Sequence, residues 1–211
     1  MKIALLGAES TGKTRLAGEL ASRLRGQEKS VAVVPEVLRE WCRREGRAPR
    51  PEEQMSIACE QERQVDEAAQ GNDIVIADTT ALMVAIYSGM LFEDGELYRF
   101  ACARQRFYDI TLVTGLDLPW MPDGLQREGA QVREEVDSLV REALAKAHVG
   151  YRVVYGRGGE RLANALAAID TGTIAAAFEP AVRPWKWVCD KCSDPQCELQ
   201  LFHFQAQHAA T

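Results

Sequence analysis

The sequence predicts an α/β fold in which a mostly parallel sheet is flanked by helices, with a small cysteine-rich extension towards the C-terminus. Short runs rich in Val and Ile alternate with helical patterns up to about residue 170, and 211 residues can bury one sizeable core. The runs expected to form strands are 3–6, 31–34, 74–77, 110–113 and 151–154. Ligands of such sheets bind at the carboxyl ends of the strands, so the residues after each run are candidates for a site.

A glycine-bearing loop, Gly-Ala-Glu-Ser-Thr-Gly-Lys-Thr at 7–14, follows the first run. Gly7 and Gly12 allow backbone angles at which successive amide N–H groups turn towards a phosphate. We expect Lys13 to reach the β- and γ-phosphates and the Thr14 hydroxyl to coordinate Mg²⁺. The sequence therefore predicts a P-loop NTPase. The residues expected to bind the nucleotide here are Gly7, Glu9, Ser10, Thr11, Gly12, Lys13 and Thr14.

The segment after this loop has a helical pattern, with Leu16, Leu20 and Leu24 at four-residue spacing and Ala17 and Ala21 beside them. This pattern is typical of a helix that packs on a sheet. The positive end of the helix dipole then faces the bound anion.

Charged residues follow the second run, in Pro-Glu-Val-Leu-Arg-Glu at 35–40. From their place at the end of a strand, we expect Glu36 and Arg39 to bind a small polar acceptor through its hydroxyl groups. The alternative is that both are solvated charges at the start of a helix.

A carboxylate, Asp78, ends the third run. At this position it can hold a magnesium-bound water or accept a proton from a substrate hydroxyl, so we predict a role for Asp78 in catalysis and in Mg²⁺ binding. The alternative role is to cap the helix that follows.

The segment 117–127 after the fourth run is rich in turn-forming residues and precedes a helix expected to begin near Gln131. It could form a mobile flap whose Arg127 and Arg133 close on the transferring phosphoryl group and neutralise its charge. The alternative is an ordinary surface loop with solvated arginines.

Composition excludes several other classes. The chain has 25 Lys and Arg against 31 Asp and Glu, and a net charge of −6 gives no global positive field for nucleic acid or anionic membranes. No run approaches the roughly 20 apolar residues of a membrane helix. Six cysteines without a secretion signal favour the cytoplasm. A GTPase is disfavoured because Ala81 stands where a glycine is expected and no Asn-Lys-x-Asp motif is present.

With these motifs, the chain resembles P-loop kinase domains of the NadR type, the ribosylnicotinamide kinases, within AAA-type ATP-binding domains. The resemblance covers roughly residues 1–170. It rests on the loop at 7–14, Pro-Glu-x-x-Arg-Glu at 35–40, Ile-Ala-Asp-Thr at 76–79 and Asp-x-Pro-Trp-x-x-Asp-Gly at 117–124. It implies ATP-dependent phosphoryl transfer to a nucleoside-like acceptor, nicotinamide riboside or a relative, in NAD metabolism.

The same resemblance implies roles for individual residues. Lys13 and Thr14 would handle ATP and Mg²⁺, and Arg161, in the turn at 156–161, would contact the adenine. The family places an arginine directly after Asp-Gly-x, whereas this chain has Gln126 there and Arg127 one position later. No His-x-Gly-His motif of an adenylyltransferase is present, so the resemblance is to the kinase half alone.

The C-terminal part, 171–211, is expected to be a linker and a small zinc-binding tail. A zinc site could be formed by Cys189, Cys192, Cys197 and His203, with His208 as another candidate for the fourth ligand. A redox-active pair and plain unliganded cysteines are the alternatives. The tail also leaves open a second function, an ATP-binding regulatory switch whose cysteine unit contacts a protein partner. Homo-oligomer formation is equally open.

Overall fold

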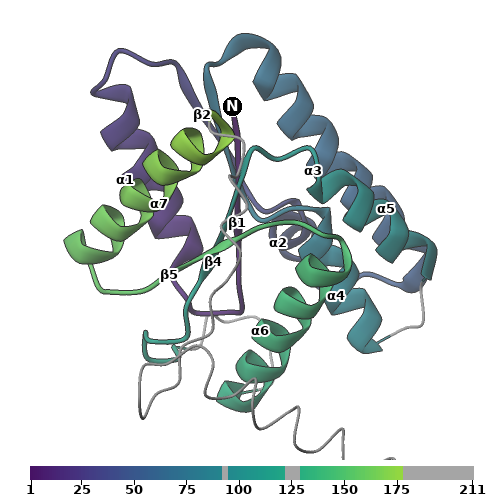
Figure 1. Cartoon of the computed structure of the whole chain (residues 1–211). Coiled ribbons are helices and arrows are strands. Elements are labelled where there is room, and N and C mark those ends of the chain that lie inside the picture. Colours follow the sequence, from purple (N-terminus) through teal and green to yellow (C-terminus); the bar gives the residue numbers. More distant parts are fainter. Residues whose placement is uncertain (92–94, 122–128, 178–211) are drawn as a thin grey trace, which may run out of the picture. The chain divides into compact units, whose positions relative to one another are not determined.

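The structure, a computed structural model, describes residues 1–91, 95–121 and 129–177 (Figure 1). The chain divides into two compact units, Met1–Thr173 and Ile174–Thr211. The predicted zinc ligands Cys189, Cys192, Cys197 and His203 lie outside the described residues. The boundary at 170 and the zinc-binding tail therefore remain predictions.

Five strands of the described part form a single parallel sheet in the order β2-β3-β1-β4-β5. The strands are β1 (Lys2–Leu6), β2 (Val31–Val34), β3 (Ile74–Asp78), β4 (Ile110–Thr114) and β5 (Arg152–Val154). Each corresponds to one of the five runs expected from the sequence. Because helices cover both faces, the central strands are continuous apolar runs rather than alternating ones. The predicted fold class is confirmed.

Helices connect the strands and form the two outer layers. They are α1 (Lys13–Arg25), α2 (Val37–Glu45), α3 (Pro51–Gly71), α4 (Ala81–Leu91), α5 (Gly95–Gln105), α6 (Gly129–Lys146) and α7 (Gly159–Ala177). Helix α6 begins close to the expected position. Helix α7 continues beyond 170, and the alanines at 175–177 favour this because alanine has the highest helix propensity. In the described part, no helix is both long and apolar enough to cross a membrane.

Two apolar layers enclose the sheet. On one face, α1 and α7 lie together (Figure 1), and Leu16 and Leu20 of α1 pack with Ile169 of α7 against the strands. On the other face, α4 is buried on nearly all sides among α3, α5 and α6, and its residues 81–86 are at most 4% exposed. The leucine spacing of α1 thus correctly predicted a helix packed on the sheet.

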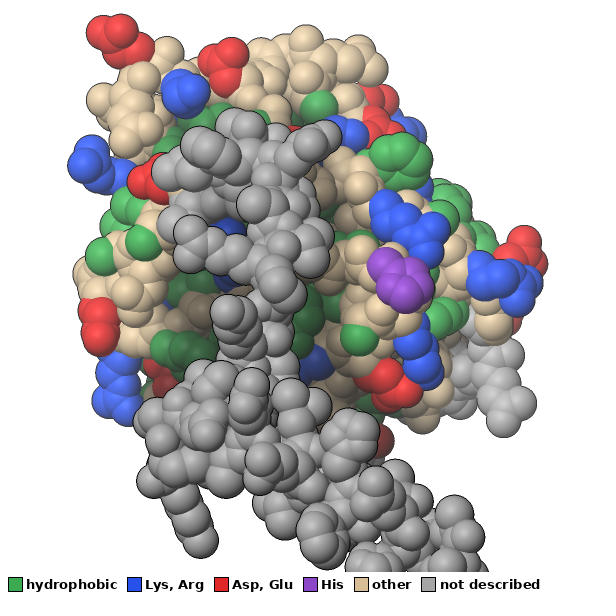
Figure 2. Space-filling view, in the orientation of Figure 1, with side chains coloured by type: hydrophobic (Ala, Val, Ile, Leu, Met, Phe, Trp, Pro, Cys, Tyr) green, Lys and Arg blue, Asp and Glu red, His purple; other side chains and the backbone are tan. Residues whose placement is uncertain are grey.

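The strand order brings three loop starts together. Leu5 of β1 pairs with Asp78 of β3, and Leu6 pairs with Val113 of β4. The segments beginning at Gly7, Asp78 and Thr114 therefore leave the same edge of the sheet side by side, where ligands of such folds bind. On the face shown in Figure 2, basic and acidic side chains are interspersed among the coloured residues rather than gathered by sign.

Candidate nucleotide-binding and phosphoryl-transfer site

The P-loop has the backbone that its two glycines predict. Gly7 has a φ of 138°, and a Cβ atom there would lie 2.3 Å from Oγ1 of Thr114. Gly12 has a φ of 80° and directly precedes α1. Both positions require glycine, because a side chain would be strained at either φ and would collide with β4 at the first.

Hydroxyl groups inside the loop fix its shape. The Thr11 hydroxyl donates to the carbonyl oxygen of Ala8 at 2.7 Å, and Thr114 at the end of β4 bonds to the Thr11 hydroxyl at 2.7 Å. Ser10, at a φ of 55°, donates through its hydroxyl to the carbonyl of Met121. Thr114 was not expected here from the sequence, although a polar residue directly after a buried apolar run was an available signal.

Lys13 lies inside the loop and is 7% exposed. Its ammonium donates to the carbonyl oxygens of Gly7 and Ala8 at 2.8 and 2.7 Å. Burial lowers the pKa of Lys13, while the nearby carboxylates, led by Glu36 and Asp78, oppose that shift. The cation is therefore held by loop carbonyls and by acidic side chains that surround it.

Asp78 is 3% exposed at the end of β3, next to the P-loop. Burial raises the pKa of Asp78 above its ordinary value, although a hydrogen bond from the Thr14 hydroxyl and the charge of Lys13 oppose the shift. Among the described residues, its Oδ1 atom has no hydrogen-bond partner. A buried acceptor atom of this kind normally has a donor, so it marks a place where a ligand can bind.

The capping alternative for Asp78 finds no support in the contacts of α4. The amide of Ala81 donates to Oε1 of Glu62 at 2.9 Å, and the amide of Leu82 donates to the Thr80 hydroxyl at 3.2 Å. These acceptors satisfy the amides that Asp78 would otherwise cap. Glu62 was not expected here from the sequence, because it lies on α3 and its sequence neighbours give no sign of this long-range contact.

Glu36 and Arg39 reach the P-loop from the start of α2. Glu36 is 5% exposed, and its carboxylate lies 3.0 Å from Nη2 of Arg39. Nη1 of Arg39 donates to the Thr14 hydroxyl at 3.4 Å. The alternative that both are solvated surface charges is thus wrong for Glu36, while Arg39 is partly exposed and connects α2 with the P-loop.

Arg133, on α6, is 6% exposed. Both of its Nη atoms donate to the carbonyl oxygen of Leu118, at 3.0 and 3.1 Å, so it holds the beginning of the predicted flap. Arg127, the other arginine predicted there, lies outside the described residues. The catalytic role of both arginines remains a prediction.

Arg161 is 4% exposed and joins four segments. It donates to the carbonyls of Thr11, Gly115 and Gly156 at 2.9, 3.2 and 2.8 Å, and it pairs with Asp117 at 3.0 Å. Burial alone would raise the pKa of Asp117, but the hydrogen bonds from Arg161 and the Gly156 amide outweigh it and lower this pKa below its ordinary value. The guanidinium thus connects the P-loop to the turn where an adenine contact was expected.

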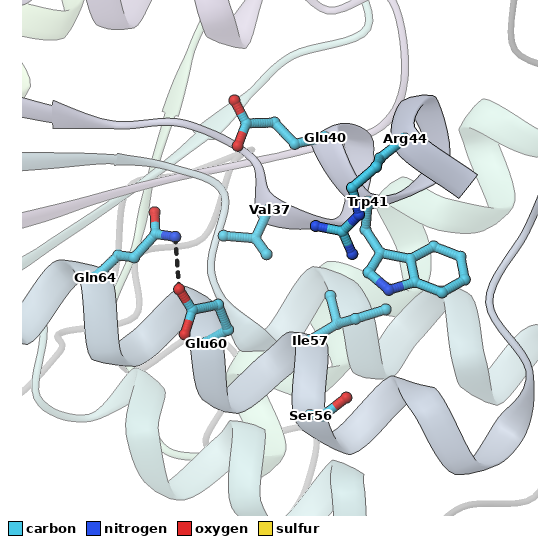
Figure 3. Close-up of a pocket in the computed structure, with 8 residues that line it drawn as sticks. All are labelled: Val37, Glu40, Trp41, Arg44, Ser56, Ile57, Glu60 and Gln64. Atoms are coloured by element: carbon cyan, nitrogen blue, oxygen red, sulfur yellow. Dashed lines mark hydrogen bonds between the residues drawn. The ribbon is translucent and has the colours of Figure 1, made fainter. Parts of the chain in front are cut away.

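Two hollows lie near these elements. One, of about 700 Å³, runs along α1 beside Thr14 and is bounded by Leu162 of α7. The other, of about 300 Å³, lies between α2 and α3 (Figure 3). It is lined by Val37, Glu40, Trp41, Arg44, Ser56, Ile57, Glu60 and Gln64. Arg39 and Trp41 are two positions apart and so face nearly opposite sides of α2, which separates this second hollow from the P-loop.

With the geometry established, comparison with known proteins gives the family. The model of an AAA domain family matches residues 2–161. The chain belongs to this AAA domain family. No curated protein matches the chain significantly.

Solved structures share the fold of this AAA domain. NadR protein in complex with NAD and AMP-PNP matches with a TM-score of 0.63 and 19% identity, and NadR in complex with NR matches with 0.65 and 20%. Both matches cover 82% of this chain but only 49% and 51% of the NadR chains, so the chain spans about half the length of those proteins.

Two kinase structures also match this chain. Thymidylate kinase from Ehrlichia chaffeensis has a TM-score of 0.57 and 16% identity, over 81% of this chain and 97% of that chain. Deoxyadenosine kinase from M. mycoides has a TM-score of 0.58 and 14% identity, over 81% of this chain and 100% of that chain. At these identities the likeness establishes the fold, and the fold resemblance to NadR expected from the motifs is confirmed.

The residues around the P-loop fit a magnesium ion that arrives with a nucleotide. Mg²⁺ prefers hard oxygen ligands and usually takes one or two from the protein, with phosphates and waters supplying the others. The Thr14 hydroxyl and the Asp78 carboxylate are hydrogen-bonded neighbours and offer such oxygens. In the described part of the AAA domain, no group of three His, Cys, Asp or Glu side chains could hold a metal without such help.

Proposed function

We propose that the protein is an ATP-dependent kinase that transfers the γ-phosphoryl group to a hydroxyl of a small nucleoside-like acceptor, nicotinamide riboside or a relative. The observation that carries this proposal is Oδ1 of Asp78, a buried acceptor atom without a partner in the described part of the chain, next to Thr14 of the P-loop. The AAA domain family and the fold shared with nucleoside and nucleotide kinases support it. The reaction would take place in the cytoplasm.

The P-loop would bind ATP through its amides and its lysine. Backbone N–H groups between Gly7 and Thr14 would surround the phosphates at the positive end of α1. Lys13, released from the carbonyls of Gly7 and Ala8, would move its ammonium to the β- and γ-phosphates. Mg²⁺, held by Thr14 and Asp78, would neutralise the phosphate charge. The hollow along α1 beside Thr14, of about 700 Å³, would receive the nucleoside part of ATP.

Asp78 would accept the proton of the attacking hydroxyl. Its raised pKa makes the carboxylate a better base than an exposed aspartate. The neighbouring Lys13 favours the charged form. A hydroxyl placed at Oδ1 of Asp78 would therefore lose its proton as it attacks the γ-phosphorus.

Glu36 and Arg39 would bind the acceptor. Together with Asp78 and Lys13 they place two carboxylates and two cations around the P-loop, and Glu9 adds a further buried carboxylate. This acidic balance favours a neutral or cationic acceptor over one that already carries a phosphate. Nicotinamide riboside, whose ring is cationic, fits this requirement.

Three arginines would complete the site. Arg133 would hold the segment from which Arg127 approaches the transferring phosphoryl group. Arg161 would keep the P-loop in register with the turn at 156–161, where adenine would bind. A zinc ion in the C-terminal tail, held by Cys189, Cys192, Cys197 and His203, would be structural and take no part in the transfer.

The deciding experiment is Mg-ATP consumption by the purified protein with a panel of nucleosides that includes nicotinamide riboside. We expect ADP formation that depends on the acceptor, with a monophosphate product identified by mass. Lys13→Ala and Asp78→Asn should both abolish it. ATP binding without acceptor-dependent turnover for any nucleoside would refute the kinase and favour a regulatory switch. A protein lacking 180–211 would then test the switch, because it should still bind ATP but no longer bind its partner.

A further inference from the structure

The residue that follows Asp78 has a strained backbone. Thr79 has a φ of 79°, a left-handed conformation in which the β-branched side chain crowds its own backbone. Such a conformation is disfavoured by roughly 10- to 100-fold unless surrounding contacts hold it. Since Thr79 is joined directly to Asp78, the contacts that hold this turn also determine the position of the Asp78 carboxylate.

Hydrogen bonds hold the turn on both sides of the strained residue. The Thr79 amide donates to the carbonyl of Leu5 in β1 at 3.1 Å. After the turn, the Thr80 hydroxyl donates to Oε1 of Gln105, the last residue of α5, at 2.7 Å. The Ala81 amide donates to Oε1 of Glu62 at 2.9 Å. Glu62 thereby anchors the first residue of α4 to α3.

Glu62 is buried, at 3% exposure, and accepts from several donors. The Tyr108 hydroxyl lies 3.2 Å from its carboxylate and Nε of Arg104 lies 3.4 Å from it. Arg104 also pairs with Asp66 at 2.6 Å. A carboxylate can serve these donors together with the Ala81 amide because it has two acceptor oxygens and no hydrogen to place.

We propose that Glu62 is a positioning residue for phosphoryl transfer, which holds the strained turn at Thr79 and thereby places the Asp78 carboxylate beside Thr14. This inference rests on the proposed kinase function for its effect on rate. Glu62 acts through the Ala81 amide and the backbone of the turn, and it does not touch the reacting atoms. A carboxylate that only stabilised the fold would alter the unfolding temperature and leave kcat unchanged.

The test is Glu62→Gln, alone and combined with Thr79→Gly. The Ala81 amide and Arg104 donate to different oxygens of Glu62, and glutamine has only one acceptor oxygen. When that oxygen serves Arg104, the glutamine NH₂ group faces the Ala81 amide and the bond to Ala81 is lost. Because small displacements of a catalytic group are costly, we expect kcat to fall roughly 10- to 100-fold while KM for ATP stays within about twofold. Glycine adopts a φ of 79° without strain, so the double variant should recover most of the lost kcat.

The matched control is a substitution of Asp66, the other carboxylate that pairs with Arg104. Asp66→Asn breaks the ion pair between Asp66 and Arg104 but leaves Glu62 bonded to Ala81. We expect a lower unfolding temperature with kcat within about twofold of wild type. Equal loss of kcat in Asp66→Asn and Glu62→Gln would overturn the proposal, as would a double variant no faster than Glu62→Gln.

Crystal structures of the same variants test the geometry without turnover. In Glu62→Gln, Thr79 should leave the left-handed region and the Asp78 carboxylate should move away from Thr14. An unchanged turn in that variant would overturn the positioning role. Wild-type protein without turnover would instead refute the proposed kinase, and the crystal structures would still decide what Glu62 holds.

Discussion

The guanidinium of Arg161 donates a hydrogen bond to the carbonyl oxygen of Thr11 at 2.9 Å, across 150 residues of sequence. The same side chain also binds Gly115 and Gly156 and pairs with Asp117. A single side chain thus fixes the P-loop, the end of β4 and the turn before α7 relative to one another. The loop's shape therefore depends on a residue that lies far outside its own motif.

Arg161→Ala should weaken ATP binding and the fold together. Hydrogen bonds that involve a charged group contribute about 1.5–3 kcal/mol each, so the unfolding free energy should fall by at least that amount. We expect the dissociation constant for Mg-ATP, measured by calorimetry, to rise about tenfold or more. Arg157→Ala is the matched control, because Arg157 is exposed and, within the described residues, its side chain is bonded only to the Asp117 carbonyl, at 3.4 Å. This variant should change neither quantity appreciably.

Glycines of the P-loop and of α1 should respond oppositely to alanine. At Gly7 the new Cβ would lie 2.3 Å from Oγ1 of Thr114, so Gly7→Ala should destabilise the protein by about 1–3 kcal/mol. At Gly18, inside α1, a Cβ would meet nothing within 4 Å, and Gly18→Ala should stabilise the protein by about 0.5–1 kcal/mol. Chemical denaturation of both variants gives the comparison, and a Gly7→Ala protein with wild-type stability would contradict the assigned loop geometry.

The elements that the sequence predicted well are those with a local signal. Each strand is a short apolar run because both faces of the sheet are covered, and the P-loop depends on two glycines whose φ angles would strain a residue with a side chain. Glu62, Thr114 and Asp117 were missed or given no role. Their partners lie on other elements, and spacing along the chain carries no information about such contacts.

Arginine roles show the same limit. From the sequence, Arg133 was expected in a flap after the fourth run, and the family resemblance placed Arg161 in the turn at 156–161. It could not show that both side chains bind backbone carbonyls of neighbouring segments, because that depends on the packing of α6 and α7 against loops. Fold topology, in contrast, brought Glu36 and Asp78 to one edge of the sheet, as the parallel order predicts.

The turnover rate should fall on the acid side as Asp78 takes up a proton. Burial raises the pKa of Asp78 above its ordinary value of 3.8, whereas a Mg²⁺ ion held by the same carboxylate would favour its ionised form, so the pH of the acid limb reports the balance of these two effects. The measurement is kcat against pH with saturating Mg-ATP and acceptor. A limb that persists unchanged in the residual activity of Asp78→Asn would assign the titration to another group.

Asp78→Asn should lower turnover but raise the free energy of unfolding at neutral pH. The pKa of Asp78 is higher in the folded than in the unfolded protein, so folding favours its protonated form and the ionised form destabilises the fold. Asp78→Asn should therefore be more stable than wild type at pH 7, and the difference should vanish as the pH falls below the unfolded pKa. Urea unfolding at pH 7 and near pH 3.5 measures it. A variant less stable at pH 7 would show that the carboxylate is held by favourable contacts that outweigh its burial.

Acceptor binding should depend on Glu36 and not on its neighbour Glu40, one helical turn further along α2. Glu36 is buried and lies 3.0 Å from Nη2 of Arg39, which itself reaches Thr14. Glu36→Gln removes the negative charge and keeps the shape, so KM for the acceptor should rise about tenfold while KM for ATP changes less than twofold. Glu40 is exposed, and Glu40→Gln should leave both values unchanged. Equal effects of Glu36→Gln on the two KM values would mean that the Glu36–Arg39 pair supports the P-loop rather than the acceptor, because Arg39 also contacts Thr14.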